Sequence, residues 1–413
     1  MTPPELSPEI VLFHILPKLP GKSLLRFKCV CKQWRSFLAT PLFANIHLHH
    51  LTTVDPHRHE KVLFMASTAT SGPLAAKMVQ SPSLVVTHYN QNAWIVASSV
   101  NGLVCVGILK HTTTEFFDMT IWNPLTGEYK MLSKPIDTKC YSRNAMAFEL
   151  YYSCSDDDQV PNRFEWQQLQ VEGWSVGAGR ASLAGGSTAD GSSRALKLVR
   201  AYDQARELNN LDDDYKILSI TTDRNVYIYS LRSDSWRKLE STLDHEDRIP
   251  CVGDHNLLDK KLHFLMGKRS RYIIIRFDLK TQKFTKIAVP PSCGRENLSL
   301  MVVRGCIELT RFRKVLRGTR MIEMWRMNGD GKWMQIVNIS YPPDVDRTMR
   351  TKPLYLLRNG NLIVKLTFYG IGISICKVDP KKNYTEDELC SGSTIGPLRT
   401  YIETFVSPNQ YVT

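Results

Sequence analysis

The chain has 413 residues, more than one hydrophobic core usually encloses, so we expect two folded units. Hydrophobic residues make up 43% and charged residues 23%, as in an ordinary globular protein. No apolar run approaches the roughly 18 residues of a membrane span, and the first residues lack a signal-peptide pattern. We therefore expect no membrane association and a cytoplasmic or nuclear location.

Basic residues outnumber acidic ones, 53 against 40, for a formal net charge of +13. This excess permits binding to nucleic acid or to an acidic partner but does not establish either. The densest basic run has one interleaved aromatic, Phe312, and falls between two strand-like runs. A charged hairpin loop is therefore favoured over a single-strand nucleic-acid platform. The run consists of Arg311, Arg313, Lys314, Arg317 and Arg320.

The ten cysteines have no regular spacing and include no Cys-x-x-Cys pair, so we expect free thiols and no zinc site. A loose histidine cluster also lacks metal-ligand spacing, which favours a solvated connector over a metal centre. We predict no metal and no cofactor. The cluster consists of His47, His49, His50, His57 and His59.

Start and stop signals predict three short helices between Leu6 and Leu38. Ser7 suits an N-cap and Pro8 suits the first helical position, while Pro20 and Gly21 end this first helix. A segment this short cannot enclose all of its large apolar side chains by itself. Part of its apolar surface therefore needs a partner. Ordinary core helices of a larger domain remain the alternative. The remaining signals are a cap at Ser23, a third helix from about Cys31 and a stop at Pro41.

The segment resembles a plant-type F-box. The sequence departs from the family pattern at two points. Ser7 stands where the family commonly has proline, and the spacing from Glu9 to Ile15 is one residue longer than in the family. The resemblance implies docking on a Skp-type adaptor, which links the chain to a cullin-based ubiquitin ligase. The matching residues are Ile15, Leu16, Leu19, Pro20, Lys22, Ser23, Leu24, Arg26, Phe27, Cys29, Val30, Cys31, Lys32 and Trp34. The residues expected to contact the adaptor are Leu16, Leu19, Pro20, Leu24, Leu25, Val30 and Trp34.

Beyond the helices the pattern changes to short strands. We place the helical unit at residues 1–43, a polar connector at 44–60 and an all-β domain at 61–413. Asn101 and Gly102 predict a hairpin turn. The first expected strands are Lys61–Ala66, Ser83–His88, Trp94–Ser98 and Leu103–Ile108.

A unit of strand, polar turn and aromatic residue recurs along the all-β domain. It begins at Ile121, Val226, Ile273, Ile322 and, more weakly, Ile373. The aromatics that restart the second strand are Tyr129, Trp236, Phe284, Trp333 and Tyr384. They are separated by 107, 48, 49 and 51 residues, so the first interval is close to two periods. A period near 50 predicts a β-propeller of about six or seven blades, whose aromatics pack between blades.

This half resembles the F-box-associated domain, a kelch-like propeller relative found in a large plant family. Residues 149–195 depart from it, with an acidic patch at Asp156–Asp158 and a Gly/Ser/Ala run. That composition favours a disordered insertion or a gene-model artefact. The matching stretches are SSVNGLVCV from Ser98, IWNPLTGEYK from Ile121, DDDYKIL from Asp212, VYIYSLRSDSWR from Val226, FDLKTQKF from Phe277 and LLRNGNLIV from Leu356.

No enzyme motif is present. Gly21-Lys22-Ser23 lacks the earlier glycine and preceding strand of a P-loop, and no nucleophile elbow, zinc helix or dinucleotide fingerprint occurs. The carboxylates at 212–214 beside Tyr215 could act as acid and base, but a solvated turn is the simpler interpretation.

The resemblances imply an α+β multidomain protein that is non-catalytic. It would be the substrate-recognition subunit of a Skp–cullin–F-box ubiquitin ligase, with an unidentified protein target bound by unidentified propeller loops. A basic propeller that binds nucleic acid or another polyanion is the alternative. A third possibility, a propeller enzyme, would require a bound metal or turnover.

Overall fold

The computed structural model describes most of the chain as helices, strands and short connections. The ranges described are 10–53, 60–67, 74–80, 84–89, 97–109, 117–133, 145–153, 214–221, 225–240, 255–268, 271–291, 298–303, 305–314, 320–341, 348–356, 362–368, 372–378, 386–392, 394–395 and 399–410.

The N-terminal part is helical, and its element ends follow local chemistry. The Cys31 thiol caps α2 by accepting a hydrogen bond from the Trp34 amide, and the Thr40 hydroxyl accepts one from the Phe43 amide at the start of α3. Pro41 occupies the first position of α3, where its missing N–H costs nothing. The elements are η1 (Ile10–Ile15), η2 (Leu16–Lys18), α1 (Gly21–Phe27), α2 (Lys32–Phe37) and α3 (Pro41–Thr53).

Helix α3 corrects the connector that we expected over residues 44–60. Its buried side chains lie on more than one side of the helix, because Phe43 faces the helical core and Leu48 faces a core of the β-domain. His47, assigned above to a solvated cluster, is fully buried. The polar composition predicted a connector, whereas this stretch is a helix that the helical core and the β-domain cover on two sides. His57 and His59 lie outside the described residues.

Six antiparallel sheets follow, each built from strands that are mostly consecutive in sequence. The first contains β1 (Glu60–Ser67), β2 (Leu74–Gln80), β3 (Leu84–Tyr89), β24 (Thr394–Ile395) and β25 (Arg399–Ile402). The second contains β4 (Ala97–Val100), β5 (Leu103–Leu109), β6 (Phe117–Trp122) and β7 (Tyr129–Met131). The third contains β8 (Ala145–Ser153), β9 (Asp214–Thr221), β10 (Val226–Ser230) and β11 (Ser235–Leu239).

The remaining three sheets repeat the same four-strand meander. They contain β12 (His255–Leu258), β13 (Lys261–Lys268), β14 (Arg271–Asp278) and β15 (Phe284–Ala288), then β16 (Leu298–Val303), β17 (Cys306–Lys314), β18 (Arg320–Met327) and β19 (Trp333–Tyr341), and finally β20 (Thr348–Leu356), β21 (Leu362–Phe368), β22 (Gly372–Val378) and β23 (Glu386–Gly392).

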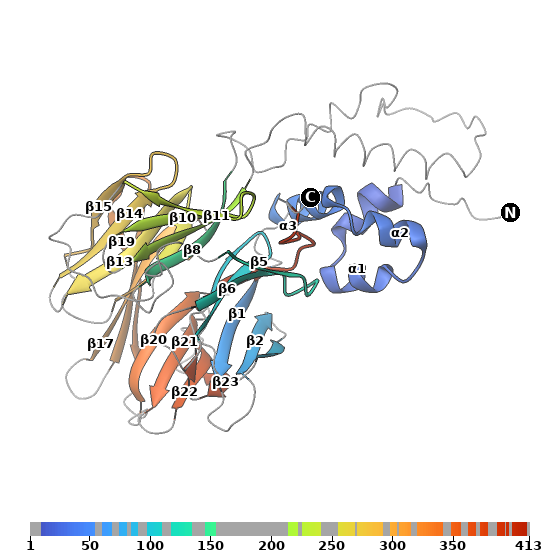
Figure 1. Cartoon of the computed structure of the whole chain (residues 1–413). Coiled ribbons are helices and arrows are strands. Elements are labelled where there is room, and N and C mark those ends of the chain that lie inside the picture. The colour runs from blue at the N-terminus through green and yellow to red at the C-terminus, as the bar shows by residue number, and fades with distance from the viewer. Residues whose placement is uncertain are drawn as a thin grey trace, which may run out of the picture.

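The sheets form a β-propeller-like arrangement beside the helical region, to its left and below it in Figure 1. The first strands of successive sheets are neighbours, with β4 beside β8, β8 beside β12, β12 beside β16 and β16 beside β20. Strand β1 pairs with β24 and β25, so the start and end of the β-domain share one sheet. This pairing joins the end of the β-domain to its start and so closes the series of sheets.

The predicted repeat units are confirmed as the third and fourth strands of successive sheets. They correspond to β6–β7, β10–β11, β14–β15, β18–β19 and β22–β23. Tyr129, Trp236, Phe284 and Trp333 lie at or next to the start of the fourth strand, while Tyr384 lies outside the described residues. The interval of 107 residues does not contain two periods. Its two repeat units belong to neighbouring sheets, and the extra length falls in the sequence between β8 and β9, at residues 154–213.

Three of these aromatics pack as expected. Trp236 contacts Tyr229 with ring centroids 5.2 Å apart, and its indole N–H donates to the Ser133 carbonyl at 3.0 Å. Phe284 contacts Phe277 of its own hairpin and packs against a core that includes Leu218 of β9, and the Trp333 indole donates to the Ala288 carbonyl at 2.8 Å. Tyr129 differs, because 63% of it is exposed.

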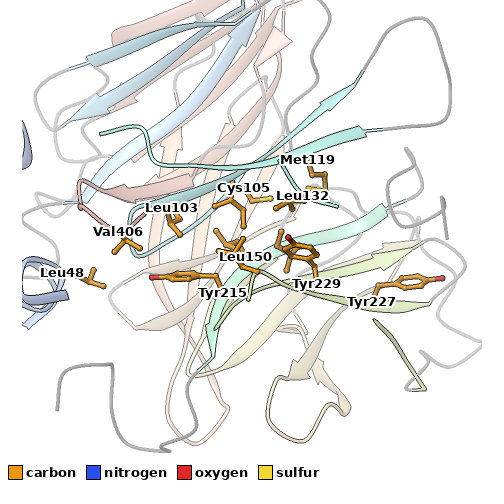
Figure 2. Packing of buried hydrophobic residues seen from close by; sticks show 13 residues of the cluster. Leu48, Leu103, Cys105, Met119, Leu132, Leu150, Tyr215, Tyr227, Tyr229 and Val406 are labelled. Atoms are coloured by element: carbon orange, nitrogen blue, oxygen red, sulfur yellow. The ribbon is translucent and has the colours of Figure 1, made fainter. Parts of the chain in front are cut away.

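One hydrophobic core lies between the sheets β4–β7 and β8–β11 (Figure 2). Leu103 and Cys105 from β5 meet Leu150 from β8 and Tyr215 from β9. The predicted 149–195 insertion is wrong at its start, because residues 149–153 belong to β8. Its remainder, from residue 154, lies outside the described residues.

Two charged residues, one from each of the segments we expected to be surface loops, are buried in strands. Arg311 is buried in β17, where its guanidinium pairs with Glu323 and lies 5.4 Å from the Trp325 ring centroid. Asp214 is buried at the start of β9 and accepts hydrogen bonds from the Ser230 hydroxyl and the Arg232 amide. In both cases strand pairing supplies partners that the local sequence does not reveal. Of the helices described, none is long and apolar enough to cross a bilayer.

Candidate functional site

The helical region has its own hydrophobic core. Phe37 packs edge-on against Phe13 at 5.0 Å and against Phe43 at 5.4 Å between ring centroids. Phe405, near the end of the chain, completes this core. Its other buried members are Leu12, Leu16, Leu24, Leu38, Leu42 and Ala44.

The seven residues expected to contact an adaptor divide into three groups. Leu16 and Leu24 are at most 1% exposed, so they hold the helices together and offer no surface. Leu19, Leu25 and Trp34 are partly buried and pack against the same core. Pro20 is exposed, and Val30 is 59% exposed. The adaptor contact itself stays a prediction for the residues with surface to offer.

Local contacts fix the two turns that present these residues. The His47 ring lies with Nε2 3.2 Å from the Leu19 carbonyl oxygen, immediately before Pro20. The Trp34 ring packs edge-on against Phe27 at 5.6 Å, across the turn that carries Val30. Both turns are therefore held from inside the helical region.

The surface of this region combines exposed apolar side chains with positive charge. Ile10 is 42% exposed and Ile15 is 36% exposed, and neither was among the predicted contacts. Residues 10–53 contain no acidic residue at all. The exposed fraction of Ile10 and Ile15 could not be read from the sequence, but the charge imbalance could. The basic side chains are those of Lys18, Lys22, Arg26, Lys28, Lys32 and Arg35.

One of the titratable side chains of this region has a shifted pKa. His49 is partly enclosed, and burial lowers the pKa of its imidazole below the ordinary value. Among the described residues no group of three or more His, Cys, Asp or Glu side chains could hold a metal ion. An apolar surface with surrounding cations can instead bury a hydrophobic partner that carries acidic groups.

The fold defines a class of protein, namely a β-propeller-like domain that carries a small helical domain. Residues 8–49 match the family model described as F-box-like, and residues 195–376 match the model of the F-box associated beta propeller domain. The chain therefore belongs to the plant F-box proteins that carry an F-box-associated beta propeller domain.

Similar proteins agree with that assignment. The Arabidopsis thaliana F-box protein At3g08750 is 24% identical over 79% of this chain and 70% of its own length. The Arabidopsis thaliana F-box/kelch-repeat protein At3g23880 is 23% identical over 99% of this chain and 98% of its own. The solved structure of YjhT covers 80% of this chain and 94% of its own at 10% identity, with a TM-score of 0.37, which is too low to support an argument.

Proposed function

We propose that this protein is the substrate-recognition subunit of a Skp–cullin–F-box ubiquitin ligase. The helical region would dock on a Skp-type adaptor and through it on a cullin, while the propeller holds a protein target. The mechanism is proximity, because a target held near a charged conjugating enzyme reacts at a raised effective concentration. The chain would contribute no catalytic group and would act in the cytoplasm or nucleus.

One observation carries the proposal: exposed apolar side chains lie on the helical region of residues 10–53, a range that contains no acidic residue. Val30 stands in the turn between α1 and α2, with Lys28 and Lys32 two residues away on either side. An adaptor surface with apolar pockets and acidic margins would complement it. Burying an exposed apolar side chain of this size contributes about 1.5 to 3 kcal/mol.

The second half of the proposal concerns the β-domain. We infer that each of the six sheets is one propeller blade and that the target binds loops at one face.

Val30→Asp is expected to weaken adaptor binding by about tenfold or more, because a carboxylate would have to be buried where a valine packed. The fold should survive, since the side chain is 59% exposed. Binding is measured by co-purification and by titration of a Skp-type adaptor into the full chain.

Met334→Asp on β19 is the matched control, because Met334 is 56% exposed and lies on the propeller. It should bind adaptor like the wild type. A folded wild-type chain that recovers no adaptor would refute the ligase role. Equal binding by both variants would refute this surface as the contact.

A further inference from the structure

The C-terminal residues 403–407, which we call the coupling segment, pass between the helical region and the propeller. Figure 1 shows the chain end beside α3, between the other helices and strands β5 and β6. Successive side chains of the segment belong to different cores. Phe405 lies in the core of the helical region, whereas Val406 lies in the propeller core shown in Figure 2.

Phe405 is integral to the helical core. Its ring centroid lies 5.5 Å from that of Phe43 and 5.6 Å from that of His47, edge-on to both. The Lys28 ammonium lies 5.2 Å from the same ring, within range of a cation–π contact. The ring is 6% exposed, so the helices enclose a residue that follows the last strand of the propeller.

Asn123 anchors the coupling segment to the propeller. Its side-chain amide donates to the carbonyl of Thr404 at 2.9 Å and to that of Val406 at 2.8 Å, while the residue is fully buried. Its side-chain oxygen Oδ1 accepts hydrogen bonds from the backbone amides of Leu125 and Thr126, which fixes the side chain in its hairpin. One asparagine therefore grips the backbone on both sides of Phe405.

Direct contacts support the same junction. Leu48 of α3 packs into the propeller core of Figure 2. A Cβ at Gly21 would come within 2.7 Å of a Leu125 side-chain carbon and 3.3 Å of the Glu403 Cβ, so α1 begins against both the hairpin and the coupling segment. The Thr404 hydroxyl donates to the Asn101 carbonyl at 2.7 Å.

We propose that the coupling segment holds the helical region in one fixed orientation on the propeller. The helices and propeller then form a single body, and the protein differs from two domains joined by a flexible tether. Resting on the proposed ligase function, this makes residues 403–407 positioning residues for ubiquitin transfer. They would set which target lysines come within reach of the conjugating enzyme bound to the complex.

The orientation can be measured on the full chain without any partner. Spin labels would be placed through non-canonical amino acids at Arg35 on α2 and Lys286 on β15, both of which are exposed. Double electron–electron resonance then gives the distribution of distances between the two labels. The wild type should give one narrow distance.

Asn123→Asp is the most selective variant. It preserves the side-chain size and the oxygen that holds the hairpin. It replaces the NH2 group, which donates to the carbonyls of Thr404 and Val406, by a carboxylate oxygen that can only accept. If the helices then lose their fixed orientation on the propeller, the distribution should become clearly broader than that of the wild type. Asn409→Asp makes the same chemical change at an exposed position nearby and should leave the distribution narrow.

Phe405→Ala should broaden the distribution as well, and Phe405→Leu should restore most of the wild-type width because it refills the helical core. The leucine variant also covers the possibility that the alanine variant fails to fold. A broad distribution in the wild type would overturn the proposal, and so would narrow distributions in folded Asn123→Asp and Phe405→Ala. Adaptor titration of the same samples separates these outcomes from failure of the ligase role.

Discussion

Phe43→Ala is expected to lower the free energy of unfolding by about 3 to 5 kcal/mol, the usual cost of truncating a buried phenylalanine. The ring is fully buried and makes edge contacts with Phe37 and Phe405 and a stacked contact with His47. Its removal opens a cavity where the helices meet the chain end, and rigid neighbours on both sides limit collapse. Urea unfolding followed by circular dichroism measures the change.

Tyr129→Ala is the control for this truncation. Tyr129 is an aromatic residue of similar size, but 63% of it is exposed on the edge strand β7. Its loss should change the free energy of unfolding by less than about 1 kcal/mol. A small effect of Phe43→Ala, similar to that of the control, would contradict a shared core between α3 and the coupling segment.

Arg326→Met is expected to destabilise the protein by about 3 to 5 kcal/mol, because it removes the cation that pairs with a fully buried carboxylate. The Arg326 guanidinium donates from Nε at 2.9 Å and from Nη2 at 2.6 Å to the same oxygen of Glu308. The Glu308 side chain is fully buried, whereas that of Arg326 is 33% exposed. The glutamate on β17 would keep its charge away from water without this cation on β18.

The double variant Glu308→Leu with Arg326→Met tests the cause. Because both charges are then replaced by apolar groups, most of the lost stability should return. The wild type, the single variants Arg326→Met and Glu308→Leu, and the double variant form a double-mutant cycle measured by urea unfolding. Additive losses in the double variant would show that the pair is not the source of the effect.

The repeat of the β-domain was predictable because its signals are local. Each unit combines a strand, a polar turn and an aromatic residue within one hairpin, so its pattern can be recognised from a short stretch of sequence. The pairing of β14 with β15, for example, places Phe284 opposite Phe277, as the sequence order suggests. Periodicity therefore located the third and fourth strands of successive sheets.

The errors arose where distant segments supply the environment. Residues 44–53 look polar, yet α3 is a helix because the helical core and the propeller cover it from two sides. Arg311 and Asp214 look like surface charges, yet partners on neighbouring strands and turns bury them. The spacing of 107 residues suggested a missing unit, because sequence spacing cannot distinguish an extra blade from extra length within one.

The helical surface that we propose for docking was predictable only in part. The F-box pattern located the segment that matches the F-box-like family model, and the absence of acidic residues from residues 10–53 is visible in the sequence. Which apolar residues face outward was not, because Leu16 and Leu24 are enclosed while Ile10 and Ile15 are exposed. The role of Phe405 could not be found locally, since more than 350 residues separate it from Phe43.

The most direct test of the ligase role is assembly of the full chain with a Skp-type adaptor and a cullin, measured by size-exclusion chromatography with light scattering. We expect one complex that contains one copy each of the chain, the adaptor and the cullin. Elution of the folded chain alone, while adaptor and cullin elute together, would contradict it.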